Sequence, residues 1–204
     1  MSKINVLNII PDSRIVKSTD GFRFEIIFEV LEPLKEVIEW KLIYIGSSQD
    51  KRFDQELESI EIGPLQMGSM KFEFDSEGPD MSKVPEEERV GVTAILLLCT
   101  YKSQEFFRCG YYINNIYDCE ELIENPPEKP LVSRLQRIIQ ADQPRITIFN
   151  IDWDEGEVKP LDNIQEEKDG ESLNSFTPVL NDKDLIYKAE SDRSQTTNLT
   201  DKEM

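Results

Sequence analysis

The stretch 22–31 reads FRFEIIFEVL, and it decides the fold. Apolar side chains occupy every second position, while the charged Arg23 and Glu25 stand between them. Successive side chains of a β-strand point to opposite faces, so this alternation predicts a strand with one buried face. The residues expected on the buried face are Phe22, Phe24, Ile26 and Phe28.

Seven further runs of β-rich composition lie around this stretch, each bounded by turn residues. They cover residues 4–10, 37–46, 57–62, 71–75, 90–101, 105–114 and 145–153. The residues Lys102-Ser103-Gln104, between two of these runs, indicate a hairpin. Eight short strands separated by turns are typical of a two-sheet antiparallel sandwich. We therefore expect an all-β, immunoglobulin-like β-sandwich with short helical connections.

Two segments beyond residue 117 are less regular. Residues 118–125 predict a short helix that ends before Pro126-Pro127, because proline cannot continue a helix. Residues 131–139 allow two interpretations. The spacing of their apolar side chains suits a helix, and the same residues could form a strand that pairs with residues 145–151.

The charge and the residue inventory exclude several classes of function. The 204 residues include 41 acidic and 23 basic side chains and no histidine, for a net charge of −18. The absence of histidine excludes Ser-His-Asp and Cys-His catalysis and histidine-ligated zinc. The negative charge argues against direct DNA binding and favours a basic partner. No spacing indicates a catalytic pair, a cofactor or a metal, so we expect a protein that is not an enzyme.

The three cysteines do not have the spacing of metal ligands. We expect Cys99 and Cys109, which fall in predicted strands, to act as small core side chains. The N-terminal residues show no signal pattern, and no run of 18 apolar residues occurs. These features predict an intracellular protein without a membrane span.

The composition changes near residue 155. Residues 156–204 contain 12 acidic and 6 basic residues but only two aromatic ones, Phe176 and Tyr187. Such a segment buries too little apolar surface to offset an ordering entropy of roughly 1–2 kcal/mol per residue. We therefore expect a folded core over residues 1–155 and an acidic, mostly disordered tail over residues 156–204.

The run 92–99 reads VTAILLLC and is apolar on both faces of the expected strand. In a sandwich only one face of each sheet meets the core. The other face is either covered by a segment such as 118–125 or exposed as an interaction site. An exposed apolar strip with carboxylates around it would suit a basic amphipathic helix.

Eight strings of residues also point to a family. They are Phe24-Glu25-Ile26, Phe28-Glu29, Glu39-Trp40-Lys41-Leu42, Tyr44-Ile45-Gly46-Ser47-Ser48, Asp54-Gln55-Glu56-Leu57, Gly110-Tyr111-Tyr112-Ile113-Asn114-Asn115, Glu124-Asn125-Pro126-Pro127 and Pro144-Arg145-Ile146-Thr147. In this order, and over residues 1–155 without gaps, the chain resembles the anti-silencing-function histone chaperone family.

The resemblance implies an immunoglobulin-like protein that binds a dimer of the core histones H-three and H-four. It implies that the dimer's tetramerisation surface is blocked and that the dimer is delivered in nucleosome assembly and disassembly, with no cofactor. A groove for the C-terminal helix of H-three is implied at Ile45, Asp54, Ala94, Leu96, Glu105, Arg108 and Tyr112. Addition of the C-terminal strand of H-four to a sheet edge is implied at Val6, Pro144, Arg145, Ile146 and Thr147.

A third surface is implied on the opposite sheet, for short basic peptides of downstream histone chaperones. The matching positions are Glu36, Val37, Glu39, Glu58, Ile60, Ile62 and Phe72. Two residues depart from the family pattern, since Ala94 stands for the usual valine and Val37 for the usual aspartate.

The resemblance further implies a monomeric regulator of chromatin and transcription. It would work in the nucleus and exchange with the cytoplasm. The alternative is a generic immunoglobulin-like adaptor that binds basic peptides.

Overall fold

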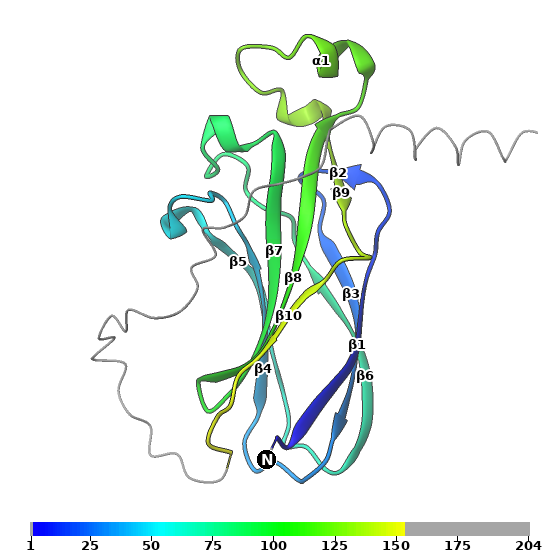
Figure 1. Cartoon of the computed structure of the whole chain (residues 1–204), viewed down its shortest axis with the longest axis vertical. Helices are drawn as coiled ribbons and strands as arrows, with labels where there is room; N and C mark the ends of the chain where they lie inside the picture. Colours follow the sequence, from blue (N-terminus) through cyan, green and yellow to red (C-terminus); the bar gives the residue numbers. More distant parts are fainter. Residues whose placement is uncertain (1, 154–204) are drawn as a thin grey trace, which may run out of the picture. The chain divides into compact units, whose positions relative to one another are not determined.

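The computed structural model describes residues 2–153, which form two antiparallel sheets packed against each other (Figure 1). The smaller sheet has the order β1-β3-β6, with strands β1 (Ile4–Pro11), β3 (Phe22–Val30) and β6 (Gly68–Ser76). The larger sheet has seven strands, with β10 added beside β8. The strands follow one another in the order β2 (Val16–Lys17), β9 (Leu135–Ile139), β8 (Gln104–Tyr117), β7 (Gly91–Tyr101), β4 (Ile38–Tyr44) and β5 (Gln55–Ile62). The seventh strand is β10 (Arg145–Ile148). The predicted all-β sandwich is confirmed.

The core lies between the two sheets and is rich in aromatic rings. All four predicted inward residues of β3 are buried. The Phe28 ring lies 6.2 Å from that of Trp40 on β4, and the Phe24 ring lies 6.0 Å from that of Tyr111 on β8. These contacts join the smaller sheet to the larger one. The period-2 pattern of the sequence therefore predicts the buried face correctly. Alternate side chains of a strand point to opposite faces, so the apolar set lies together on the side of the core.

The β7–β8 hairpin is the centre of the larger sheet. Tyr101 pairs with Gln104, so the turn consists of Lys102 and Ser103, with φ angles of 50° and 62°. Two consecutive residues with positive φ give a tight turn whose twist matches that of the flanking strands. The predicted hairpin is confirmed. Cys99 and Cys109, one on each strand, are buried free thiols, also as predicted.

The structure confirms one of the irregular segments, decides between the two interpretations of the other, and adds one strand. The helix within 118–125 is present as α1 (Glu120–Glu124), which follows β8 at one end of the sandwich (Figure 1). Residues 131–139 form a short 3-10 turn, η3 (Val132–Arg134), and then strand β9. That strand pairs with β2 and β8, not with residues 145–151. The two-residue strand β2 was not predicted, because two residues show no period.

The strand predicted over 145–153 ends at Ile148. On the shared edge of β8, β9 pairs with residues 113–117 and β10 with residues 107–110. Because β9 and β10 follow one another along this edge, they do not pair with each other. Residues 149–153 leave the sheet, and the segment 156–204, predicted as a tail, lies outside the described residues.

A buried arginine links β9 to the smaller sheet. The Arg137 guanidinium carbon lies 3.6 Å from the centroid of the Phe22 ring, and its two terminal nitrogens donate to the carbonyl oxygens of Asp20 and Gly21, at 2.6 Å each. Burial lowers the pKa of Arg137 to about 10. The cation is tolerated because carbonyl groups and a ring face replace the lost water.

The end of the described chain completes the core. Trp153 is only 7% exposed, and its ring lies 4.9 Å from that of Phe106 and 5.5 Å from that of Tyr101. Residues 149–153 therefore close the sandwich at the hairpin end although they belong to no strand.

We predict that Trp153→Ala lowers the free energy of unfolding by about 3 kcal/mol, because it leaves a cavity between two aromatic rings. Urea denaturation measures this change. Met67→Ala, at a side chain that is 67% exposed, is the control and should have little effect. A Trp153 variant as stable as the unchanged chain would contradict this role in the core.

Candidate functional site

The outward face of β7 is the first candidate surface. Ile95, Leu97 and Cys99 are buried toward the core, whereas Ala94, Leu96 and Leu98 on the other face are only partly buried. Val92, at the start of the same row, is 48% exposed. Helix α1 contacts the end of β8, and no described segment buries this row. Of the two interpretations of residues 92–99, the exposed interaction face is therefore the one that fits residues 2–153.

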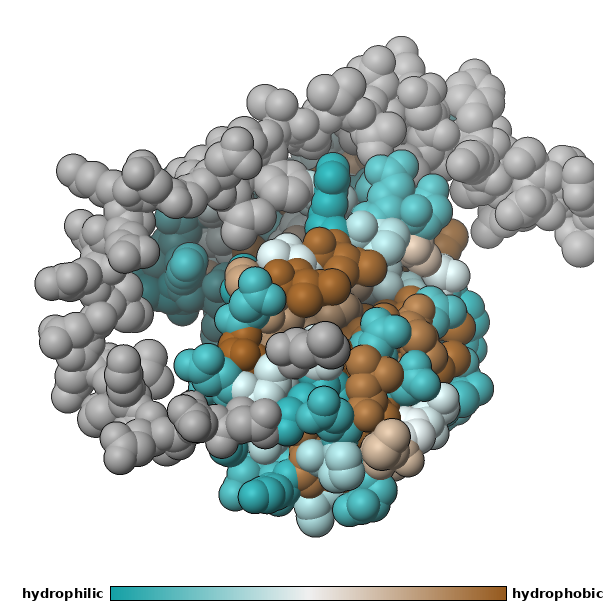
Figure 2. Space-filling view, turned by 60° about the horizontal axis from the view of Figure 1, so that its bottom comes forward, coloured by the Kyte–Doolittle hydropathy of each residue, from teal (hydrophilic) through white to brown (hydrophobic). Residues whose placement is uncertain are grey.

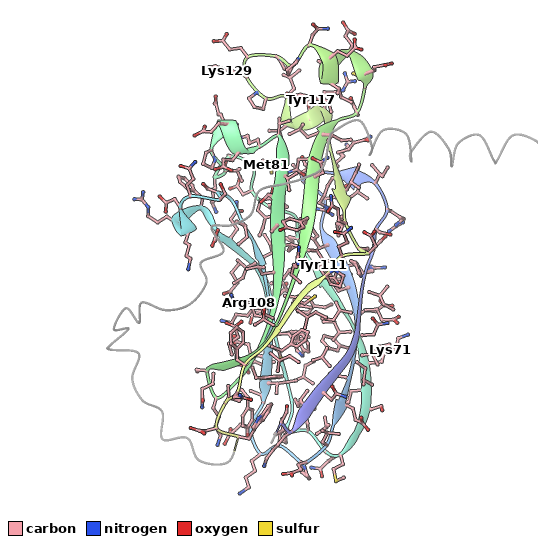
Figure 3. The ribbon with its side chains drawn as sticks, viewed as in Figure 1. Lys71, Met81, Arg108, Tyr111, Tyr117 and Lys129 are labelled. Atoms are coloured by element: carbon pink, nitrogen blue, oxygen red, sulfur yellow. The ribbon has the colours of Figure 1, made fainter. Side chains whose placement is uncertain are left out.

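The strand register brings the predicted helix-binding residues together on this surface. Ala94 pairs with Tyr112, and Leu98 pairs with Arg108. The backbone N–H of Ile45 donates to the carbonyl of Ala94 at 3.0 Å. We define the β7 face as the outward row of β7 together with its neighbours Ile45, Asp54, Glu105, Arg108 and Tyr112. Figure 3 shows Arg108 and Tyr111 on β8, Arg108 on this outer side and Tyr111 between the sheets.

A glycine allows a leucine to lie flat on this face. Gly110 pairs with Leu96, and a Cβ at Gly110 would lie 3.0 Å from Leu96 Cδ2. The leucine side chain thus covers bare backbone of β8. Gly110 was not among the predicted site residues, although a glycine inside a strand signals a close approach of another group.

Asp54 borders the β7 face next to Ile45. It caps the 3-10 turn η1 (Lys51–Phe53), and its carboxylate accepts a hydrogen bond from the Gly46 N–H. A Cβ at Gly46 would overlap the Phe53 carbonyl oxygen, so only glycine allows this close packing. The Asp54 oxygen Oδ1 is buried and has no hydrogen-bond partner among the described residues. Burial raises the pKa of Asp54 above its ordinary value. A donor from a binding partner would satisfy this oxygen.

A charged pair borders the β7 face at the hairpin end. Arg108 donates from Nε and Nη2 to the two carboxylate oxygens of Glu105, at 2.7 and 2.8 Å. This bidentate geometry fixes the guanidinium plane. Further along β8, burial raises the pKa of Tyr112, and Arg145 beside its hydroxyl acts in the opposite direction.

The second predicted surface lies at the seam between β1 and β10. A pocket of about 490 Å³ opens there, lined by Val6, Pro144 and Ile146 together with core residues such as Tyr111 and Phe107. Figure 2 views the end of the molecule where β1 begins and shows apolar residues grouped among polar ones. Ile148, which also lines the pocket, is 72% exposed. The other two predicted residues, Arg145 and Thr147, alternate with Ile146 along β10. They therefore point away from the pocket, toward the β7 face.

The third predicted surface is not on the opposite sheet. Of its strand residues, only Phe72, on β6, belongs to the smaller sheet, since β4 and β5 are in the same sheet as β7. Ile60 and Ile62 pair with the core-facing Trp40 and Ile38, so they point to the inner side of β5, near β6. Glu36 and Val37 precede β4 and lie against Gly63, at the end of β5.

Glu39 does not share that side of the sheet. It alternates with Trp40 and points outward, where Lys41 Nζ lies 3.0 Å away and Ser59 Oγ donates at 2.9 Å. Burial acts to raise the pKa of Glu39, but these hydrogen bonds leave it below its ordinary value. Glu58 pairs with Leu42 and faces inward with the isoleucines. The sequence could not show which of these residues point to the same face of the sheet, because that depends on the strand register.

Within residues 2–153, no group of three or more acidic or cysteine side chains is placed to hold a metal ion. No helix in the same range has the length and apolar character needed to cross a membrane.

Comparison with known proteins gives a family match. The family described as "ASF1 like histone chaperone" matches residues 1–154. The chain is similar to "Histone chaperone asf1" of Drosophila melanogaster, at 46% identity over 78% of this chain and 72% of that protein. It is 44% identical to "Histone chaperone ASF1B" of Mus musculus over 88% of this chain and 90% of that protein. "Histone chaperone asf1" of Emericella nidulans is 42% identical over 85% of this chain, but the match spans only 62% of that longer protein.

We predict that the charge on Asp54 costs stability at neutral pH. Because its pKa in the folded chain lies above the unfolded value, the folded chain binds more protons between these two pKa values. Stability therefore falls as pH rises through this window. Asp54→Asn does not titrate, so its stability relative to the unchanged chain should be greater at pH 7 than near pH 3. Urea denaturation of both chains at the two pH values measures this, and an equal difference at both would contradict it.

Proposed function

Because the chain belongs to the ASF1-like histone chaperone family, we propose that it binds a dimer of the core histones H-three and H-four. It covers the surface by which two such dimers would form a tetramer, and it delivers the dimer in nucleosome assembly and disassembly. The observation that carries this proposal is the partly exposed apolar row of β7, with Asp54 on one side and the Glu105–Arg108 pair on another.

The β7 face suits an amphipathic helix. Leu96, lying over Gly110, and Ala94 beside Tyr112 form a smooth apolar strip on which one stripe of a helix can pack. The charged groups at its borders select the polar residues beside that stripe. Asp54 accepts from a donor or a cation, and Arg108 donates to an acceptor. The C-terminal helix of H-three is the occupant that we propose.

The pocket between β1 and β10 suits an added strand. β10 pairs only with β8 in the described chain, so the backbone groups of its other edge can bind a further strand. Every second side chain of such a strand would point toward the pocket, whose volume is sufficient for an aromatic ring. We assign this site to the C-terminal strand of H-four.

The net charge of the protein affects the rate at which it meets a partner, whereas the shape of its surfaces decides which partner binds. A net charge of −18 attracts a strongly basic partner and speeds association at low salt. The apolar strip and the strand edge discriminate between partners. In this mechanism binding energy alone shields the histone dimer, and neither a cofactor nor catalysis is needed. The proposal places the protein in the nucleus as a monomer that does not bind DNA itself.

Release of the histone dimer requires a downstream protein that takes it over. We propose a third surface for contact with that protein. The inner side of β5, with Ile60, Ile62 and Glu58 near Phe72 of β6, offers apolar and acidic groups to short basic peptides of downstream histone chaperones. Glu39 contributes less than the resemblance implies, because Lys41 and Ser59 already satisfy its carboxylate.

The competing function is a generic adaptor for basic peptides. Net charge would then dominate binding, and any basic protein of similar size would bind as tightly as the histone dimer. Gel filtration of the chain with the histone dimer, and in parallel with an unrelated basic protein, separates the two functions. Equal binding to both would favour the adaptor.

We predict that Arg108→Glu weakens binding of the histone dimer at least ~100-fold, because it replaces a donor on the β7 face with a second carboxylate beside Glu105. Tyr112→Glu should act similarly. Titration of the folded variants with labelled histone dimer gives the affinities, and thermal unfolding checks the fold.

Arg23→Glu is the matched control for this charge reversal. Arg23 also pairs with a carboxylate, that of Asp75 at 2.6 Å, but on the outer face of the smaller sheet. It should leave the affinity within a few fold of the unchanged chain. An Arg108 variant that binds as well as the Arg23 variant would refute the assignment of the β7 face.

We predict that deletion of residues 156–204 leaves the affinity for the histone dimer largely intact at physiological salt, because the proposed surfaces lie within residues 2–153. The deletion removes a net charge of −6, so association at low salt should be slower. Stopped-flow association at two salt concentrations measures this. Loss of binding on deletion would show that the proposed surfaces are insufficient.

A further inference from the structure

Phe149 lies against the guanidinium group of Arg108. The distance from the Arg108 guanidinium carbon to the centre of the Phe149 ring is 5.4 Å, within the range of a cation–π contact. Thr147 pairs with Arg108 across β10 and β8, and Phe149 follows two residues later on the same side of the chain. Phe149 therefore belongs to the β7 face, although no sequence pattern singled it out.

The position of Phe149 is fixed by the core. Its backbone N–H donates to the Phe106 carbonyl at 2.9 Å, and the Phe106 side chain packs on Trp153 at 4.9 Å between ring centres. Phe149 is 38% exposed. An anchored backbone with an accessible ring is suited to supporting a neighbouring side chain on the surface.

Arg108 is thus held from two directions. Glu105 binds the edge of the guanidinium through Nε and Nη2, and Phe149 faces it. Nη1 makes no hydrogen bond within residues 2–153, so its two N–H groups remain for an acceptor on a partner. Arginine has many rotamers, and ordering it before binding reduces the entropy lost on association.

We propose that Phe149 is a positioning residue, which holds Arg108 in its binding orientation on the β7 face. The inference rests on the proposed function of that face. Phe149 contributes to binding only by holding Arg108. The contribution therefore requires the positive charge of Arg108 and an aromatic ring at position 149.

A double-mutant cycle with the full chain and labelled histone dimer tests this. Phe149→Leu keeps an apolar side chain but removes the ring, and it should weaken binding roughly two- to fivefold, the size of an exposed cation–π contact. Phe149→Tyr keeps the ring and should bind like the unchanged chain. In the background of Arg108→Gln, Phe149→Leu should cause no further loss.

Phe22→Leu is the matched control, since it removes another ring that faces an arginine, 3.6 Å from the Arg137 guanidinium carbon, and Phe22 lies on none of the proposed binding surfaces. It should leave the affinity unchanged, and thermal unfolding compares its effect on stability with that of Phe149→Leu. If Arg108→Gln weakens binding but Phe149→Leu does not, the inference is wrong and the proposed function stands. Equal losses with and without Arg108 would show a direct contact, and would also overturn it. If neither change affects binding, the assignment of the β7 face itself fails.

Discussion

A strand in a two-layer sandwich can bury only one of its two faces against the opposite sheet. In β7 both faces are apolar. Ile95 and Leu97 fill the core, which leaves Ala94 and Leu96 on the outer side without a covering element in the described chain. Exposing such a row costs free energy unless a partner covers it. The proposed function follows from this surplus of apolar surface, since a histone helix would provide the missing layer.

The short strand β10 connects the two proposed histone sites. Its side chains alternate between the pocket at β1, lined by Ile146 and Ile148, and the β7 face, to which Arg145 and Thr147 point. A helix and a strand from one histone dimer could therefore bind on the two sides of the same four residues. Binding at one site would raise the effective concentration at the other, so two modest contacts give high affinity. The core contacts of Trp153 keep the segment after β10 in place.

Much of this architecture was predictable from residue patterns. Alternation identified the buried face of β3, and the doubly apolar run 92–99 left two interpretations, a covered strand or an exposed interaction surface. The residues of the third surface could not be assigned to one side of the sheet. Glu39 and Glu58 are both acidic strand residues, but the β4–β5 register turns one outward and the other inward. A shift of one residue in register exchanges the two faces, and short-range patterns do not report register.

Local chemistry therefore decides which segments become strands and which of their faces are apolar, because both depend on neighbours along the chain. Contacts between distant segments decide the rest. They place β9 and β10 along one edge of β8, bring Phe149 onto Arg108, and leave one Asp54 oxygen buried without a partner. Each of these features arises where residues far apart in sequence meet, and only the packed sheets bring those residues together.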